Sequence, residues 1–255
     1  MYCLSRAQGE ARRPCFLDTV TVVYSIAVVS VAYLVRGIAG FGSALIAVPL
    51  LALMFPITVV VPLVVFLDFL GSLGQGVKNR SAIAWRELLP IFPFSFLGVI
   101  VALYLFQTVE STALAKGLGL FVLAFAIYQL LPLPEMRGSR WFAAPAGVFG
   151  GLLGTLFGTG GPFYVIYLTL RGLDKTAFRP SFATNFLIEG VVRLSGYVIA
   201  GFLSPDWIQA FLITVPAATV ALFLGGRIHT RISQQSFKRI ISVLLVCSGS
   251  ALLFR

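Results

Sequence analysis

The chain has 255 residues, of which 58% are hydrophobic and only 11% are charged, and its formal net charge is +10. A soluble domain cannot bury so much apolar surface, so the composition indicates a protein that crosses a membrane several times. Nucleic-acid binding is excluded as the reason for the positive charge, because the basic residues lie in short segments between apolar runs.

After a short N-terminal tail, the chain consists of apolar runs at 17–54, 57–77, 88–107, 113–131, 142–170, 180–202, 207–226 and 237–254. Most have ordinary spanning length. The runs 17–54 and 142–170 would instead measure roughly 55 and 43 Å as single helices, at about 1.5 Å per residue. The hydrocarbon core is only about 30 Å thick. Each long run has a glycine cluster near its middle, so we predict two broken helices.

The two long runs also begin two similar halves of the chain. A shift of 118 residues places Gly40 on Gly158 and Gly42 on Gly160, and a short apolar half-helix and three spans follow each cluster. We therefore predict an all-α integral membrane protein with an internal duplication. The expected tail, first repeat, cytoplasmic linker and second repeat are 1–16, 17–131, 132–141 and 142–255.

Basic residues occupy alternate connections between the spans. Twelve Lys and Arg residues lie in the segments 78–86, 132–141, 171–179 and 227–239, whereas the connections at 55–57, 108–112 and 203–206 contain none. The basic set is expected to face the cytoplasm. The run 142–170 then lies between two cytoplasmic segments and must return to its starting side as a hairpin. Each repeat is thus a broken-helix hairpin followed by three transmembrane helices, and the second repeat is inverted. The side of the N-terminus stays open.

The glycine clusters are expected to form a binding site. Backbone breaks are tolerated in lipid only where they are buried in protein or line a cavity. A half-helix that begins at a break directs its first N–H groups and its positive dipole end into that cavity, which suits an anion. Pro162 fits the first turn of such a half-helix. The substrate-binding residues expected at the breaks are Gly40, Phe41, Gly42, Ser43, Gly158, Thr159, Gly160 and Gly161.

Close helix packing is the alternative role for small residues in a membrane. We assign that role to four glycines that precede the second break, Gly147, Gly150, Gly151 and Gly154.

Both glycine clusters resemble motifs of a known family. The stretch 40–49, GFGSALIAVP, is similar to the first-repeat signature of the TauE/SafE family of membrane permeases, and 158–162, GTGGP, is similar to the second. The resemblance covers nearly the whole chain after residue 17. It departs at Ser43, Ala44 and Tyr167, where the family usually has glycine or proline. The resemblance implies a permease of the inner cell membrane for sulfite, sulfonates or related organic anions, often moved outward.

Charged side chains within the spans are functional candidates, since each costs about 3 kcal/mol at the centre of an isolated helix. Glu189 and Arg193 lie four residues apart. Either they pair with each other, or Glu189 accepts a coupling proton and Arg193 binds the substrate. Asp68 either relays a coupling proton or accepts backbone hydrogen bonds. Arg36 either neutralises a bound anion or reaches the interface, and Asn185 is a candidate donor to the substrate.

We therefore expect a secondary transporter of small anions, with export favoured. A proton is the candidate coupling ion and a homodimer the candidate assembly. No cofactor, metal or catalytic residue is expected: the chain lacks H-E-x-x-H and G-x-S-x-G, and its cysteines have no metal spacing. An anion channel and an intramembrane enzyme are the alternatives.

Overall fold

The computed structural model describes residues 19–40, 42–76, 80–130, 138–202, 205–227 and 234–254. These residues form helices and the turns between them, without a strand. In chain order the elements are α1 Thr19–Ala39, α2 Ser43–Leu51, α3 Ile57–Gly76, η1 Arg80–Ala82, α4 Trp85–Leu88, α5 Phe92–Thr108, α6 Ser111–Leu130, η2 Arg140–Phe142, α7 Ala143–Phe157, α8 Gly161–Leu170, α9 Lys175–Ile199, α10 Pro205–Arg227 and α11 Gln234–Leu253.

Both long apolar runs are broken at their glycine clusters, as predicted. The first run forms α1 and α2, and between them Gly40 and Gly42 have φ angles of 86° and 98°. The second run forms α7 and α8, which are separated at Gly158 with a φ of 69°. This left-handed region is costly for residues that carry a Cβ atom. Glycine is therefore what allows the chain to leave each helix abruptly.

Each broken pair returns to the side on which it starts. Near the beginning of α1, the Tyr24 hydroxyl donates to the carbonyl of Leu50 at the end of α2, at 2.7 Å. Just before α7, the Gly138 N–H donates to the carbonyl of Leu170 at the end of α8, at 2.9 Å. The hairpin predicted for 142–170 is present, and α1 and α2 form a second one.

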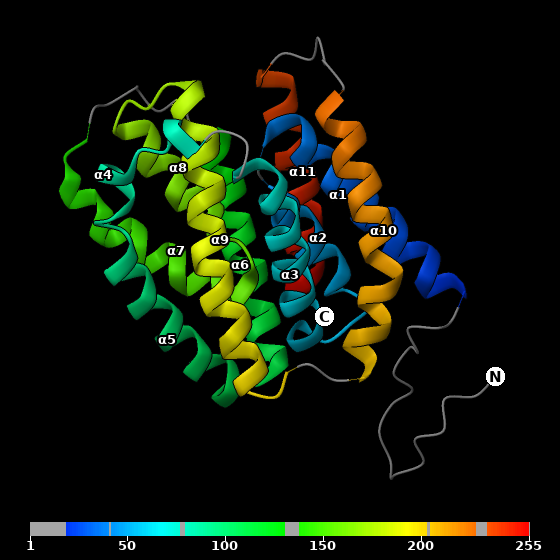
Figure 1. Cartoon of the computed structure of the whole chain (residues 1–255). Helices are drawn as coiled ribbons and strands as arrows, with labels where there is room; N and C mark the ends of the chain where they lie inside the picture. Colours follow the sequence, from blue (N-terminus) through cyan, green and yellow to red (C-terminus); the bar gives the residue numbers. More distant parts are fainter. Residues whose placement is uncertain are drawn as a thin grey trace.

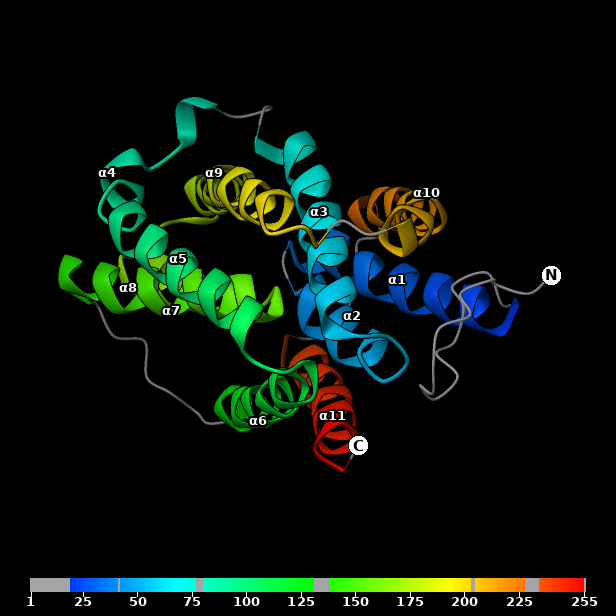
Figure 2. The same cartoon turned by 90° about the horizontal axis from the view of Figure 1, so that it is seen from below.

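Four helix pairs make the main packing contacts: α1 with α10, α7 with α5, α3 with α9, and α6 with α11 (Figures 1 and 2). Glycine allows close approach in the first two. Gly37 of α1 faces Gly225 of α10, and Gly151 of α7 faces the backbone carbonyl of Ser95 in α5. A Cβ atom at either glycine would collide with the neighbouring backbone. The packing role that we predicted for Gly151 is confirmed.

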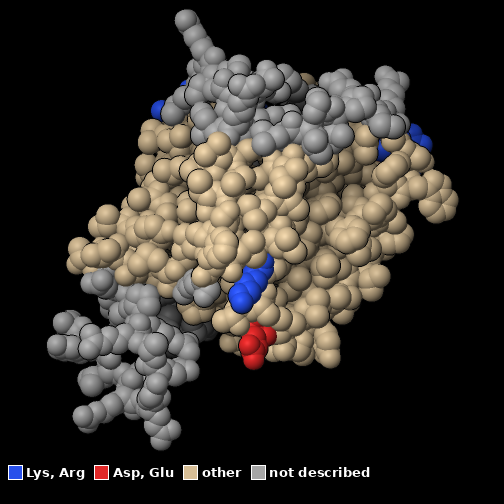
Figure 3. All heavy atoms as spheres, turned by 180° about the vertical axis from the view of Figure 1, so that it is seen from behind, with Lys and Arg blue, Asp and Glu red and all other residues tan. Residues whose placement is uncertain are grey.

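The outside of the helix assembly is apolar. Ile100 and Leu120 are each 65% exposed, and the face drawn in Figure 3 is almost free of charged residues across its middle. Within the described residues, Thr19–Ile38, Ser111–Gln129 and Trp207–Arg227 are long and apolar enough to cross a membrane. Such a surface suits lipid and would be a liability in water.

Three of the basic connections, those beside α4, before α7 and after α8, meet at one end of the molecule. Glu87 of α4 pairs with Arg140, just before α7, at 3.1 Å and with Arg171, just after α8, at 2.8 Å. Burial raises the pKa of Glu87, but hydrogen bonds from Arg171 and Arg140 outweigh it and hold the pKa below its ordinary value. At the opposite end, the rings of Phe106 and Phe202 stack edge to face at 4.8 Å. The basic segments around α4, α7 and α8 thus share one side, as predicted.

Candidate functional site

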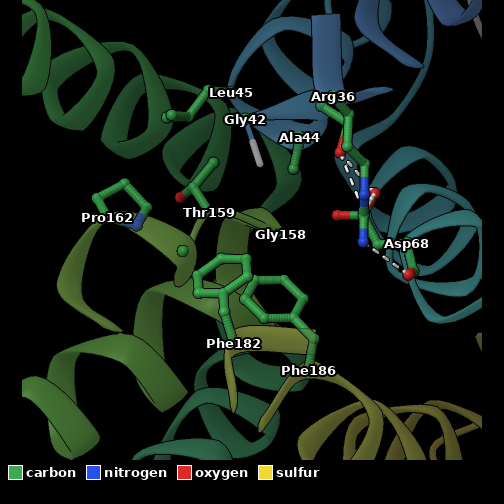
Figure 4. Close-up of a pocket in the computed structure, with 12 residues that line it drawn as sticks. Arg36, Gly42, Ala44, Leu45, Asp68, Gly158, Thr159, Pro162, Phe182 and Phe186 are labelled. Carbon is green, nitrogen blue, oxygen red and sulfur yellow. Dashed lines mark hydrogen bonds and ion pairs between the residues drawn. The ribbon is translucent and has the colours of Figure 1, made fainter. Parts of the chain in front are cut away.

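The two helix breaks, far apart in the sequence, meet around one cavity, which we call the break cavity (Figure 4). Its polar wall comprises Arg36, Ser43, Asp68 and Thr159, and its apolar wall comprises Ala44, Leu45, Pro162, Phe182 and Phe186. Gly42, Gly158 and Gly161 complete the lining. The structure therefore brings together most of the residues that the sequence nominates at the two breaks.

Two half-helices begin at this cavity. Gly42 and Ser43 start α2, whereas Gly161 and Pro162 start α8. Helix N-termini have unpaired N–H groups and a partial positive charge, so the two together make an electropositive wall. Apart from its two chain neighbours, no described residue has an atom within 4 Å of the place where a Cβ of Gly42 would be. The missing side chain thus leaves open space beside the first turn of α2.

The Thr159 hydroxyl is the clearest free hydrogen-bonding group in the cavity. Thr159 is only 1% exposed, and its Oγ1 has no hydrogen-bond partner among the described residues. A buried hydroxyl without a partner is costly. By contrast, Thr155 one turn earlier donates to the carbonyl of Gly151 at 2.8 Å. Thr159 is therefore available to a bound polar molecule, and Thr155 is not.

Arg36 and Asp68 form a buried ion pair between α1 and α3. The Arg36 guanidinium also donates to Ser72 Oγ at 2.7 Å and to Ser43 Oγ at 3.2 Å. The carboxylate of Asp68 accepts from Ser43 Oγ at 2.7 Å and from the hydroxyl of Tyr33 at 2.6 Å. Arg36 thus lies inside the protein and does not reach the membrane interface. The Asp68 carboxylate accepts hydrogen bonds from side chains.

Glu189 and Arg193 form the second buried ion pair, within α9, as one of the sequence alternatives has it. Glu189 Oε1 accepts from Ser95 Oγ of α5 at 2.5 Å and from the Asn185 amide at 3.2 Å. Arg193 donates to the carbonyl of Gly150 in α7 at 3.2 Å. This pair connects α9 to α5 and α7, whereas Arg36 and Asp68 connect α1 to α3.

A second, smaller cavity adjoins the first. Asp68, Gly158 and Phe186 line both, and Arg193 lines only the second. Asp68 therefore faces both arginine residues: it pairs with Arg36, and it shares a cavity with Arg193. Glu189 is fully buried and lines neither cavity.

Sequence reasoning missed the apolar wall. Phe182 and Phe186 of α9 pack with their ring centroids 4.7 Å apart, and Phe178 stacks on Phe182 at 5.8 Å. The signal that could have revealed them is a phenylalanine at every fourth position of α9, which places all three rings on one helical face.

Gly160 requires a correction. We expected its missing side chain to leave room for a ligand, but Gly160 does not line the break cavity. A Cβ there would collide with the carbonyl of Gly150 and lie 3.1 Å from the Cα of Gly154. Glycine at position 160 allows the turn to pack on α7, which is a structural role.

Three other nominated residues lie away from the cavity lining or outside the described residues. The Asn185 side chain donates to Glu189 and does not line either cavity. Gly40 provides the left-handed turn but does not line the cavity. Phe41 lies outside the described residues.

Comparison with known proteins gives a consistent result. The family model described as sulfite exporter TauE/SafE matches residues 25–252. A protein of Comamonas testosteroni named "Probable inner membrane transporter protein TsaS" is 23% identical over 74% of this chain and 81% of its own. A protein of Cupriavidus necator named "Probable sulfite/organosulfonate exporter TauE" is 26% identical over 78% of this chain and 79% of its own. No solved structure matches this chain.

Proposed function

Since the chain belongs to the sulfite exporter TauE/SafE family, we propose that it is a secondary transporter that exports sulfite, sulfonates or related small organic anions through the break cavity. Members of this family are membrane transporters and not enzymes, and the chain is accordingly a multi-pass membrane protein. The inner membrane, named for one relative, is the location that we propose.

The observation that carries the proposal is the composition of the cavity wall. Two half-helix N-termini, a buried arginine and an unpartnered hydroxyl converge on one space. Each of these groups favours negative charge or donates a hydrogen bond. The opposite wall contains two phenylalanine rings, which suits the apolar part of an organic anion.

Inverted repeats would explain the pairing of helices. If the halves 17–131 and 142–255 are equivalent, then α1 corresponds to α7 and α5 to α10. The two extensive contacts, α1 with α10 and α7 with α5, then exchange under a single two-fold operation, while α3 with α9 and α6 with α11 map onto themselves. Each hairpin packs on a helix of the other half, so rocking the group of α1, α2 and α10 against the group of α5, α7 and α8 would open the cavity alternately to each side.

Burial favours a carrier over a channel. Ser43 and Thr159 are each 1% exposed, so the polar wall is closed to both sides among the described residues. Counterflow of labelled sulfite in vesicles tests this point, because a carrier accumulates label against an unlabelled gradient and a channel does not.

Topology is tested by single cysteines in a chain without its own cysteines. With the basic end in the cytoplasm, a cysteine at Glu110 should react with an impermeant reagent from outside, whereas one at Arg179 should not. Labelling of both from the same side would contradict the proposed topology.

Anion binding to the purified protein is the decisive experiment. Calorimetric titration with sulfite and with methanesulfonate should give saturable binding, while a cation of similar size should not bind. Ser43→Ala should weaken binding about fivefold, since it removes one hydrogen bond, worth about 1 kcal/mol, that positions the Arg36 guanidinium beside the cavity. Ser181→Ala is the matched control: Ser181 is also buried, but it accepts from the Ala84 N–H at 2.8 Å and does not line the cavity. Equal effects of both changes, or no anion binding, would contradict the proposed site.

A further inference from the structure

The charged side chains buried around the two cavities add up to zero. Arg36 and Arg193 are positive, Asp68 and Glu189 are negative, and none is more than 5% exposed. No other charged side chain lines either cavity among the described residues. A singly charged anion that enters would add an uncompensated negative charge to this buried region, which has a large free-energy cost.

Asp68 is the carboxylate placed to remove that excess charge. It lines both cavities, whereas Glu189 lines neither. The ionisable groups that face Asp68 are Arg36 and Tyr33 from α1 and, across the second cavity, Arg193 from α9. The α2 helix adds only the Ser43 hydroxyl.

The remaining helices that pack on α3 bring no charge to Asp68. The described part of α10 meets α3 through the rings of Trp207 and Phe211, which pack edge to face against Phe66. The helices α6 and α7 contribute no charged side chain to either cavity among the described residues. The charge on Asp68 is therefore balanced chiefly by the two arginine residues.

We propose that a singly charged anion and one proton occupy the break cavity together, with the proton on the carboxyl group of Asp68. The inference rests on the proposed function and adds its coupling ion. A proton from solution forms an O–H bond on Asp68 and makes the side chain neutral. Arg36 then loses its counter-charge, and its guanidinium turns to the anion. When the anion leaves, the proton dissociates and the Arg36–Asp68 ion pair forms again.

Two features of Arg36 support this exchange. Its Nε is buried and has no hydrogen-bond partner among the described residues, so the guanidinium has a free donor. Its ion pair also connects two elements, α1 and α3, and can separate when the hairpin moves. Glu189 and Arg193 lie on one helix, α9, and stay together in any rigid movement of that helix.

Neutral co-transport has a consequence for the driving force. An anion that moves alone gains free energy from the membrane potential in proportion to its charge. An anion that moves with a proton transfers no net charge. Export would then depend on the concentration gradients of the anion and the proton, and it would not depend on the potential.

Proton counting during binding tests the inference. The probe is methanesulfonate, which stays fully ionised at neutral pH and cannot take up the proton itself. Calorimetric titration of the full chain in buffers with different ionisation enthalpies should give an uptake of about one proton per bound methanesulfonate. Affinity should fall about tenfold for each unit of rising pH over the range in which binding takes up one proton.

Variants assign the proton to a residue. Asp68→Asn should reduce uptake to near zero, and whatever binding remains should lose its pH dependence. Glu87→Gln and Glu110→Gln leave the charges buried around the two cavities unchanged, and both should keep an uptake of about one proton.

Three results would overturn the inference. Binding to the wild-type chain without proton uptake would do so, and this count stands even if Asp68→Asn fails to fold. Uptake of about one proton that persists in Asp68→Asn would assign the proton elsewhere. Absence of any methanesulfonate and sulfite binding would instead refute the proposed function, and the coupling with it.

Discussion

The two buried ion pairs contain the same charges but are built differently. Glu189 and Arg193 lie four residues apart on α9, and their hydrogen bonds to other helices are with α5 and α7. Arg36 and Asp68 come from different elements, and both line the break cavity together with Ser43. A pair within one helix needs no tertiary movement to persist, whereas a pair between a hairpin and a helix exists only while the two stay in place.

This difference indicates which pair serves function. Removing one member of a buried pair leaves an unpaired charge and costs about 3–5 kcal/mol, but replacing both members with apolar residues is often tolerated. Double substitutions therefore separate the role of a pair in stability from its role in transport, which single substitutions cannot do.

The largest expected effect follows from exchanging each pair for apolar residues. We expect Arg36→Met with Asp68→Leu to fold but to reduce anion transport more than about a hundredfold, because about 3 kcal/mol of charge-assisted hydrogen bonding is lost. Glu189→Leu with Arg193→Met should retain transport within about fivefold, since that pair satisfies itself.

The measurement for both double variants is transport in vesicles, alongside a thermal unfolding curve for each. If the variant at positions 189 and 193 is as inactive as the other, then Arg193 contacts the substrate and the two pairs are not different in kind.

The second prediction compares the glycines of the two breaks. Gly160→Ala should destabilise the protein by about 2 kcal/mol or more through overpacking, because the new Cβ meets the backbone of α7. Gly42→Ala has open space and only the cost of a φ of 98°, about 1–2 kcal/mol, but its methyl group would narrow the cavity. We expect it to remain folded and to bind methanesulfonate about tenfold more weakly, a loss of about 1.4 kcal/mol. Unfolding midpoints and calorimetric affinities of both variants measure these two effects. A larger loss of stability in Gly42→Ala than in Gly160→Ala would contradict the prediction.

The sequence predicts the fold well where composition and length act alone. The runs at 17–54 and 142–170 are longer than the membrane is thick, so their length alone predicts that each is broken. Left-handed glycines are found at both breaks. The grouping of the basic connections follows from the alternation of Lys and Arg, and the contacts of Glu87 with Arg140 and Arg171 agree with it.

The site is less predictable because pairing between elements leaves no local signal. The Glu189–Arg193 pair has helical spacing and can be read from the sequence, but no spacing relates Arg36 to Asp68. The roles of the clustered glycines are equally hidden. Gly42 and Gly160 occupy corresponding positions in the two repeats, yet one borders open space and the other contacts α7. Only tertiary packing distinguishes them.

The third prediction tests the free hydroxyl at the second break. Thr159→Val should weaken methanesulfonate binding about tenfold, since a hydrogen bond to a charged group is worth about 1.5–3 kcal/mol. Thr155→Val is the matched control, because Thr155 donates to its own helix and does not line the cavity. It should leave affinity within about twofold, as about 1 kcal/mol or less of helix stability is affected. Calorimetry on both variants is sufficient, and unchanged affinity in Thr159→Val would remove this residue from the site.

The smallest effect is expected at the basic end, where the arginine partners of Glu87 are partly exposed to solvent. Glu87 is 12% exposed and Arg140 is 52% exposed, so Glu87→Gln should lower the free energy of unfolding by only about 1 kcal/mol at neutral pH. Because the native state holds the pKa of Glu87 below its ordinary value, this contribution is present above the unfolded pKa of about 4.3 and disappears as the pH falls through the native pKa. Wild type and Glu87→Gln should therefore differ at pH 7 and converge at an acid pH below the native pKa of Glu87. Exposed Glu110, changed to Gln, controls for the loss of a surface charge. Chemical unfolding in detergent at both pH values measures the difference, and a gap that persists in acid would mean that Glu87 acts through packing and not through its charge.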